Sequence, residues 1–243
     1  MTDYIYGIHA AKALIEHQPQ NIKTIYFSKT SSQRISELVA LAQTMGIATQ
    51  IVSPPKLESL AQAREHQGIV LAVKPFALRT EHDLKLDLAK QSEKAFFLIL
   101  DGIQDPHNLG ACIRTAEALG VHGLIFPQAK SASITASVRK VACGAEMGLA
   151  LYQVTNLARC IELLKSEGVW VLGAVVDASQ TLYACDLKRS IAIVMGNEQN
   201  GIRPLTQKSC DETFSIPLSG MTESLNVSVA TGICLSEVVR QRL

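Results

Sequence analysis

The chain has 243 residues, of which 47% are hydrophobic and 19% are charged, so it can bury one large core or two smaller ones. Its formal net charge is +1, which excludes binding to nucleic acid through a global positive field and leaves only local patches for such contacts. Six cysteines lie far apart without a Cys-x-x-Cys pair, a pattern that predicts free thiols and no structural metal site.

The sequence also predicts a cytoplasmic protein without a membrane span. The N-terminus, MTDYIYGIHAAK, lacks the basic region followed by an apolar run that is typical of a signal peptide. No stretch approaches the roughly 18 uninterrupted apolar residues of a membrane helix. Together with the spacing of the cysteines, these features favour a reducing compartment.

The first part of the chain alternates helical and strand patterns. Helices are predicted at residues 7–17, 35–46 and 54–63, and strands at 22–28, 47–52 and 69–74. We interpret residues 1–76 as a small α/β domain. The residues that follow begin with proline and alternate charges of opposite sign, so residues 77–94 are interpreted as a linker with room for a short helix.

The second part, residues 95–243, predicts a larger α/β domain. Strands are predicted at 95–102, 121–127, 169–176, 191–198 and 213–218, and helices at 105–120, 135–146, 156–168 and 224–241. Strands that alternate with helices indicate a mostly parallel sheet. The last helix is apolar on more than one face, which predicts that it is buried.

Parallel sheets bind ligands at the carboxyl ends of their strands, and three predicted loops there carry unusual residues. The first loop supplies Asn108 and leads to Arg114, the second reads GNEQNGI (196–202), and the third reads SGMTESLN (219–226). The motifs Gly-x-Gly-x-x-Gly, Gly-Lys-Ser/Thr and Gly-x-Ser-x-Gly are absent from the sequence. Their absence removes the dehydrogenase, P-loop ATPase and esterase interpretations.

Several of these residues have an ordinary structural explanation. Asn108 suits the N-cap of a helix that starts after Pro106, and Ser224 and Asn226 compete for the cap of the last helix. Arg114 follows Gly110 by one helical turn, and the gap left by the missing side chain suits a substrate backbone whose phosphate the guanidinium could hold.

Taken together, the three loops resemble the SpoU (TrmH-like) family of RNA ribose 2′-O-methyltransferases. The matching motifs are Asn108-x-Gly110-x-x-x-Arg114, then Met195-Gly196-Asn197-Glu198, then Ile216-Pro217-Leu218 followed by Ser224-Leu225-Asn226-Val227-Ser228. This match covers residues 95–243. The front part, with Gly7-x-His9-Ala10 and His66-Gln67-Gly68, looks like the ribosomal-protein L30e-like domain of the branch that methylates guanosine in 23S ribosomal RNA.

The resemblance implies a SPOUT-type methyltransferase domain with a C-terminal trefoil knot, the cofactor S-adenosylmethionine and a homodimer without metal. It implies catalytic roles for Asn108, Arg114, Glu198, Ser224 and Asn226. It implies contacts with the cofactor for Gly196, Ile216 and Leu225. Arg114 could act as the general base or stabilise the developing alkoxide, and the sequence leaves both roles open.

Two alternatives remain at this stage. The same reaction could serve a tRNA guanosine or a different site in ribosomal RNA, although the front domain argues against the tRNA enzyme. A non-catalytic RNA-binding protein of ribosome assembly could keep the same fold, but the intact residues Asn108, Arg114, Glu198 and Asn226 argue against it.

Overall fold

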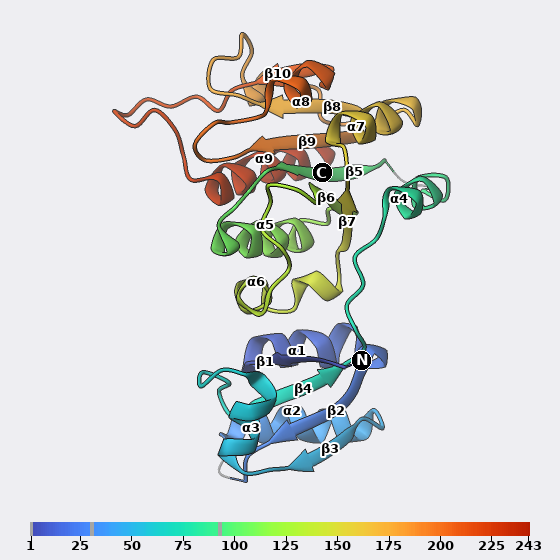
Figure 1. Cartoon of the computed structure of the whole chain (residues 1–243), viewed down its shortest axis with the longest axis vertical. Helices are drawn as coiled ribbons and strands as arrows, with labels where there is room; N and C mark the ends of the chain where they lie inside the picture. Colours follow the sequence, from blue (N-terminus) through green and yellow to red (C-terminus); the bar gives the residue numbers. More distant parts are fainter. Residues whose placement is uncertain (1, 30–31, 92–93) are drawn as a thin grey trace. The chain divides into compact units, whose positions relative to one another are not determined.

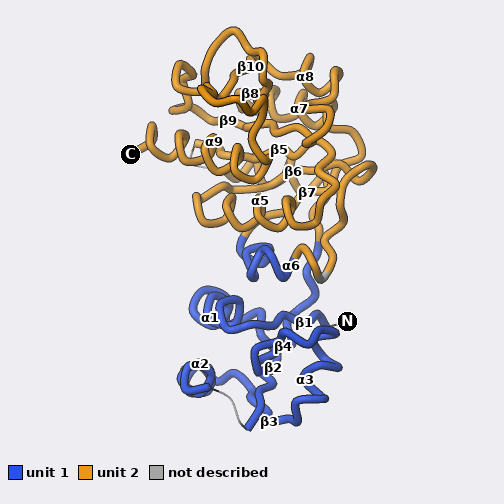
Figure 2. The backbone as a smooth tube through the Cα atoms, turned by 90° about the vertical axis from the view of Figure 1, so that its left-hand side faces the viewer, with its two compact units in different colours: residues 1–77, 139–148 blue, residues 78–138, 149–243 orange. Residues whose placement is uncertain are grey.

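The computed structural model describes residues 2–29, 32–91 and 94–243, which form two compact units (Figures 1 and 2). Unit 1 contains Met1–Ala77 and Arg139–Gly148, and unit 2 contains Leu78–Val138 and Leu149–Leu243. The chain therefore passes from one unit to the other three times. The α/β architecture predicted from the sequence is confirmed in both units.

Unit 1 is built on a four-stranded sheet with the order β1-β4-β2-β3. Its strands are β1 (Asp3–Tyr6), β2 (Ile22–Phe27), β3 (Ala48–Ile51) and β4 (Ile69–Val73), and its helical segments are α1 (Ile8–His17), η1 (Pro19–Asn21), α2 (Gln33–Thr44) and α3 (Pro54–Ala61). β4 is antiparallel to both of its neighbours, whereas β2 and β3 are parallel. The sequence analysis missed β1, which has four residues and buries only Ile5.

The two short motifs of the front part lie together at the start of α1. Gly7 precedes the helix with a φ of 99°, and the backbone N–H of Ile8 donates a hydrogen bond of 2.9 Å to Oε1 of Gln67. Gln67 thus satisfies a helix N–H that would otherwise lack a partner within the helix. The backbone N–H of Gly68 donates to Nδ1 of the buried His66 at 3.0 Å, which fixes the same turn.

A segment from the middle of the chain completes unit 1. The helix predicted at 135–146 is divided into α6 (Ala136–Ala142) and η2 (Ala145–Met147), because Cys143 and Gly144 adopt left-handed backbone angles. Arg139 donates a hydrogen bond of 2.8 Å to Asp3, and Lys140 forms an ion pair with Glu65. These contacts, between residues more than 70 positions apart, hold the segment to the sheet of unit 1.

Unit 2 contains a six-stranded parallel sheet with the order β10-β8-β9-β5-β6-β7. Its strands are β5 (Phe96–Asp101), β6 (Gly123–Pro127), β7 (Ala150–Val154), β8 (Trp170–Ala174), β9 (Ile191–Gly196) and β10 (Glu212–Phe214). Its remaining helical segments are α4 (Glu81–Leu88), α5 (Pro106–Ala118), α7 (Leu157–Ser166), η3 (Leu182–Ala184), α8 (Pro204–Ser209) and α9 (Val227–Arg242). The sequence analysis missed β7 and α8.

The predicted linker contributes to the core of unit 2. Its helix, α4, starts at a capping box formed by Thr80 and Asp83 and buries Leu84 and Leu88 in the cluster that α7 also covers. Two leucines one helical turn apart are enough to anchor a short helix, although the segment is otherwise polar.

Among the described residues, no helix has the length and apolarity needed to cross a lipid bilayer.

Glu146 is an unusual buried group of unit 1. Only 1% of its surface is exposed, and among the described residues neither carboxylate oxygen has a hydrogen-bond partner of good geometry. Burial raises the pKa of this carboxyl from 4.5 to about 7. The nearby Asp3 raises this pKa further, whereas Arg139 and the backbone N–H groups of Gly144 and Glu146 offset part of the effect.

We therefore expect the free energy of unfolding to fall as the pH rises from about 4.5 to about 7, because the folded state holds a proton that the unfolded chain has released. Glu146→Gln should remove this dependence and stabilise the protein by roughly 3 kcal/mol above pH 7. Urea unfolding across this pH range measures both effects. Glu58→Gln, at an exposed position of α3, is the matched control, and equal pH profiles for the two variants would contradict the assignment.

Candidate functional site

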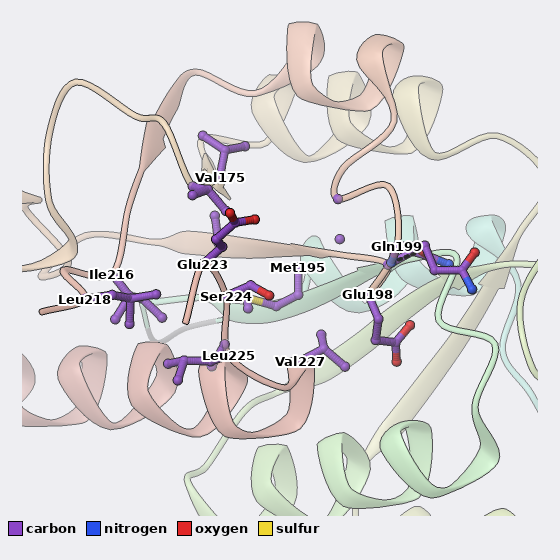
Figure 3. A pocket seen from close by; sticks show the side chains of 16 residues that line it. Val175, Met195, Glu198, Gln199, Ile216, Leu218, Glu223, Ser224, Leu225 and Val227 are labelled. Atoms are coloured by element: carbon purple, nitrogen blue, oxygen red, sulfur yellow. Dashed lines mark hydrogen bonds between the residues drawn. The ribbon is translucent and has the colours of Figure 1, made fainter. Parts of the chain in front are cut away.

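A cavity of about 340 Å³ lies at the carboxyl ends of β8 and β9 (Figure 3). Figure 3 shows Ile216, Leu218 and Leu225 gathered at one end of the cavity and Glu198 at the other. Its described lining includes two carboxylates, Glu198 and Glu223, and no Lys, Arg or His. The size is typical of a small-molecule site, and the lining suits a ligand with a flat apolar part and a positive charge.

The loop after β9 folds back on itself at Gly196. A Cβ atom at this position would lie 2.2 Å from the carbonyl carbon of Gly201 and 2.3 Å from the nitrogen of Ile202. Asn197 and Gly201 exchange backbone hydrogen bonds of 3.0 and 2.9 Å across the turn. The family resemblance implied a cofactor contact for this glycine, and the structure already requires a glycine here for the approach of the loop's own backbone.

Two anchors that the sequence analysis missed hold this loop to the end of β5. The buried carboxylate of Asp101 accepts hydrogen bonds from Arg203, at 2.9 Å from its backbone nitrogen and 2.6 Å from its Nε. The side-chain amide of Asn197 donates to the backbone oxygen of Gly102 at 3.0 Å. Asp101 ends a strand that is otherwise apolar, and this contrast was the only feature of the sequence that pointed to its role as an anchor.

Three of the predicted catalytic residues form one hydrogen-bonded cluster. The side-chain amide of Asn108 donates to Oε1 of Glu198, and the amide of Asn226 donates to Oδ1 of Asn108 at 3.0 Å. Glu198 also lines the cavity. The cluster therefore joins the start of α5, the loop after β9 and the start of α9 beside the cavity.

The structure decides the competition for the helix caps. Asp105 caps α5, because its carboxylate accepts from the backbone N–H of His107 at 2.8 Å, so the expectation that Asn108 is the cap is wrong. As the third residue of the helix, Asn108 directs its side chain to Glu198. Asn226 caps α9 by accepting from the N–H of Ser228 at 2.9 Å, and Ser224 instead lines the cavity.

Arg114 lies exposed on α5 and is not among the residues that line the cavity. Gly110, one turn earlier, is buried, so the gap that we expected above it is closed to solvent. The three residues predicted to contact the cofactor, Gly196, Ile216 and Leu225, all line the cavity.

Neither an activated thiol nor a metal site is found near the cluster among the described residues. Burial raises the pKa of the Cys112 thiol to about 11, so this thiol stays protonated at neutral pH. Among the residues that the structure describes, no group of three or more His, Cys, Asp or Glu side chains is arranged to hold a metal ion.

Comparisons with known proteins identify the family of the chain. Residues 95–236 match the SpoU rRNA Methylase family, and residues 4–78 match the family model for RNA 2′-O ribose methyltransferase substrate binding. The chain belongs to the SpoU rRNA methylase family. The resemblance inferred from the three loops is thereby confirmed.

Relatives of this family match the chain from end to end. The 23S rRNA (guanosine-2′-O-)-methyltransferase RlmB of Shewanella oneidensis is 48% identical over 241 residues, which cover 99% of this chain and 98% of the relative. RlmB of Escherichia coli K12 is 44% identical over 243 residues and is covered completely, as is this chain.

Solved structures of the family share the fold. The SpoU methyltransferase AviRb of Streptomyces viridochromogenes, in complex with AdoMet, superposes with a TM-score of 0.78 at 24% identity and covers 98% of this chain and 90% of its own. The A. aeolicus TrmH/SpoU tRNA modifying enzyme superposes with a TM-score of 0.57 at 28% identity. It covers only 67% of this chain.

The close approach at Gly196 gives a direct test of the loop. Gly196→Ala should lower the free energy of unfolding by about 1–3 kcal/mol, because the added methyl group must displace backbone atoms rather than a flexible side chain. Gly220→Ala is the matched control, since a Cβ there meets nothing within 4 Å. Urea unfolding of both variants measures the difference, and equal stabilities would show that the loop relaxes freely.

Proposed function

We propose that the chain transfers a methyl group from S-adenosylmethionine to the ribose 2′-hydroxyl of a guanosine in 23S ribosomal RNA, in the cytoplasm. Full-length similarity to RlmB proteins supports the substrate. The structural observation that carries the proposal is the cluster of Asn108, Glu198 and Asn226 beside a cavity with acidic and apolar walls.

The cavity fits the cofactor in both shape and charge. We assign Ile216 and Leu225 to the flat adenine and the backbone at Gly196 to its polar edge, because all three line the cavity. The carboxylates of Glu198 and Glu223 are placed to favour a cationic ligand, and no described lining residue opposes them with a positive charge. When bound, S-adenosylmethionine supplies a methyl group that is activated by a sulfonium.

Direct methyl transfer needs alignment of the hydroxyl and removal of its proton. In this proposal Glu198 fixes the amide of Asn108, and Asn226 fixes its carbonyl, so that Asn108 keeps one orientation. Ser224, which is exposed at the cavity, is assigned to the ribose. These residues act by positioning, and none of them needs to form a covalent bond with the substrate.

Arg114 is assigned to the substrate phosphate and to the charge that develops on the 2′-oxygen. A guanidinium grips phosphate through two parallel hydrogen bonds and stabilises an alkoxide without losing its own proton. Service as a general base would require the guanidinium to lose its proton, which is costly because arginine is effectively always protonated in proteins. Arg114→Lys distinguishes the general base from the electrostatic stabiliser, because lysine keeps the positive charge but gives up its proton more readily than arginine.

Arg114→Ala should reduce methyl transfer at least about a hundredfold, the effect of removing one group that stabilises a developing oxyanion. The affinity for S-adenosylmethionine should stay unchanged, because Arg114 does not line the cavity. Methyl incorporation into unmodified 23S rRNA, mapping of the methylated ribose and calorimetry of cofactor binding provide the measurements. Turnover like that of the wild type would remove Arg114 from the mechanism.

We also propose a C-terminal trefoil knot. The connection between β8 and β9 holds the last turn of α9, since the N–H of Leu187 donates to Oε1 of Gln241 at 3.0 Å and Gln241 donates to the backbone oxygen of Cys185 at 3.1 Å. Arg242 donates to the backbone oxygen of Arg189 at 2.7 Å. These contacts support a path in which the C-terminal segment passes through that connection.

A homodimer is proposed from the outer face of α9. Val229 is 53% exposed on this helix and Ile233, one turn further along, is only partly buried, so two neighbouring apolar side chains remain uncovered within one subunit. Exposed apolar surface of this kind is typical of an interface between subunits.

The wild type should therefore sediment as a dimer, and Val229→Glu should weaken the dimer at least tenfold, because a carboxylate would be buried at the contact. Leu205→Glu, on the exposed face of α8, is the matched control and should leave the dimer intact. Analytical ultracentrifugation over a range of concentrations measures both variants. A monomer at every concentration would refute the proposal.

A further inference from the structure

The amino edge of the sheet of unit 2, opposite the candidate site, carries a row of basic residues. Lys188 and Arg189 lie just before β9, Lys94 lies just before β5, and His122 directly precedes β6. Arg189 also lies over the ring of Trp170 at the start of β8, with its guanidinium carbon 4.4 Å from the ring centre. Because β9, β5 and β6 are neighbours about 4.8 Å apart, the row spans roughly 10 Å.

Part of this row lines an open cavity of about 810 Å³ at that edge, which Arg189 and Trp170 do not reach. Its lining includes Lys94, His122, Lys188 and Arg242, and no Asp or Glu side chain among the described residues. The nearby Asp186 lies 3.7 Å from Arg189 and neutralises part of the row. The remaining charge is positive, in a protein whose net charge is only +1.

Arg242 anchors the backbone segments that carry Lys94 and Lys188. Its guanidinium donates to the backbone oxygens of Leu187, Arg189 and Ala95 at 3.2, 2.7 and 3.1 Å, and it lies 5.0 Å from the ring centre of Phe96. The segments that carry Lys188 and Lys94 are thus tied to one side chain. Their ammonium groups are presented by an ordered surface rather than by independent loops.

A structural explanation accounts for part of this charge. Helices in a parallel α/β domain end at the amino edge of the sheet, and cations stabilise helix C-termini. That explanation covers Arg242 in the last turn of α9. It does not cover Lys94 and Lys188, which are exposed and belong to segments between helices and strands. Among the described residues, neither lysine has a carboxylate partner.

We propose that this basic edge binds the phosphodiester backbone of the RNA substrate, as a second contact remote from the site of methyl transfer. Phosphate contacts position a nucleic acid without reading its sequence, and a nearly neutral protein must obtain them from such local patches. The inference rests on the proposed rRNA methylation, because it takes the partner of this edge to be that RNA.

The test compares two double variants of the full-length protein. Lys94→Ala with Lys188→Ala should weaken binding of unmodified 23S rRNA about tenfold and reduce the slope of log affinity against log salt by about 1.5, the effect of losing two phosphate contacts. The KM for rRNA should rise while kcat and cofactor affinity stay unchanged. Lys85→Ala with Lys208→Ala, which removes two exposed lysines elsewhere on unit 2, should change none of these quantities.

Unchanged rRNA affinity in the first double variant, or equal losses in both variants, would overturn the inference. If the first double variant sediments differently from the wild type but keeps the same salt dependence of RNA binding, the edge is assigned to a contact between subunits instead. Thermal unfolding of both variants controls for folding. Failure of the proposed function is recognised separately, because the wild type itself would then bind cofactor without methylating the rRNA.

Discussion

The candidate site depends on one close approach between two stretches of backbone, Gly196 against Gly201 and Ile202. No side chain fits between them, so the loop after β9 must turn sharply as soon as the strand ends. This turn places Glu198 beside Asn108, a residue 90 positions earlier in the chain. The geometry of the polar cluster is therefore set by backbone packing before any ligand is present.

A buried carboxylate keeps that turn in place. Asp101 lies beside Gly196 in the register of β5 and β9, and it binds Arg203 at the far end of the loop. Loss of this partner would leave a buried charge unpaired, at a high cost in folding free energy, so the loop is hard to displace. Because Glu198 both lines the cavity and holds Asn108, the ligand cavity and the polar cluster share one wall.

The sequence predicted that the loops carrying Asn108, Glu198 and Asn226 lie at one edge of the sheet, because the carboxyl ends of parallel strands converge there, and the structure brings these three side chains together. It suggested Asn108 as the cap of α5, whereas Asp105 takes that position and Asn108 bonds to Glu198, a residue 90 positions away that no local pattern could reveal. The contact between Arg139 and Asp3 was also invisible, because it joins residues 136 positions apart without any local pattern. Local sequence patterns thus predicted where the loops lie, whereas the partners of the individual side chains depend on contacts between residues far apart in the chain.

The discontinuous make-up of unit 1 has a consequence for synthesis on the ribosome. Its first stretch ends at Ala77, but the segment that completes it ends at Gly148, about 70 residues later. At the usual 5–20 residues per second, roughly 4–14 s pass before the missing piece is made. During this interval the sheet of unit 1 lacks the partners of Asp3 and Glu65, so unit 1 cannot be completed until the first stretch of unit 2 has been made.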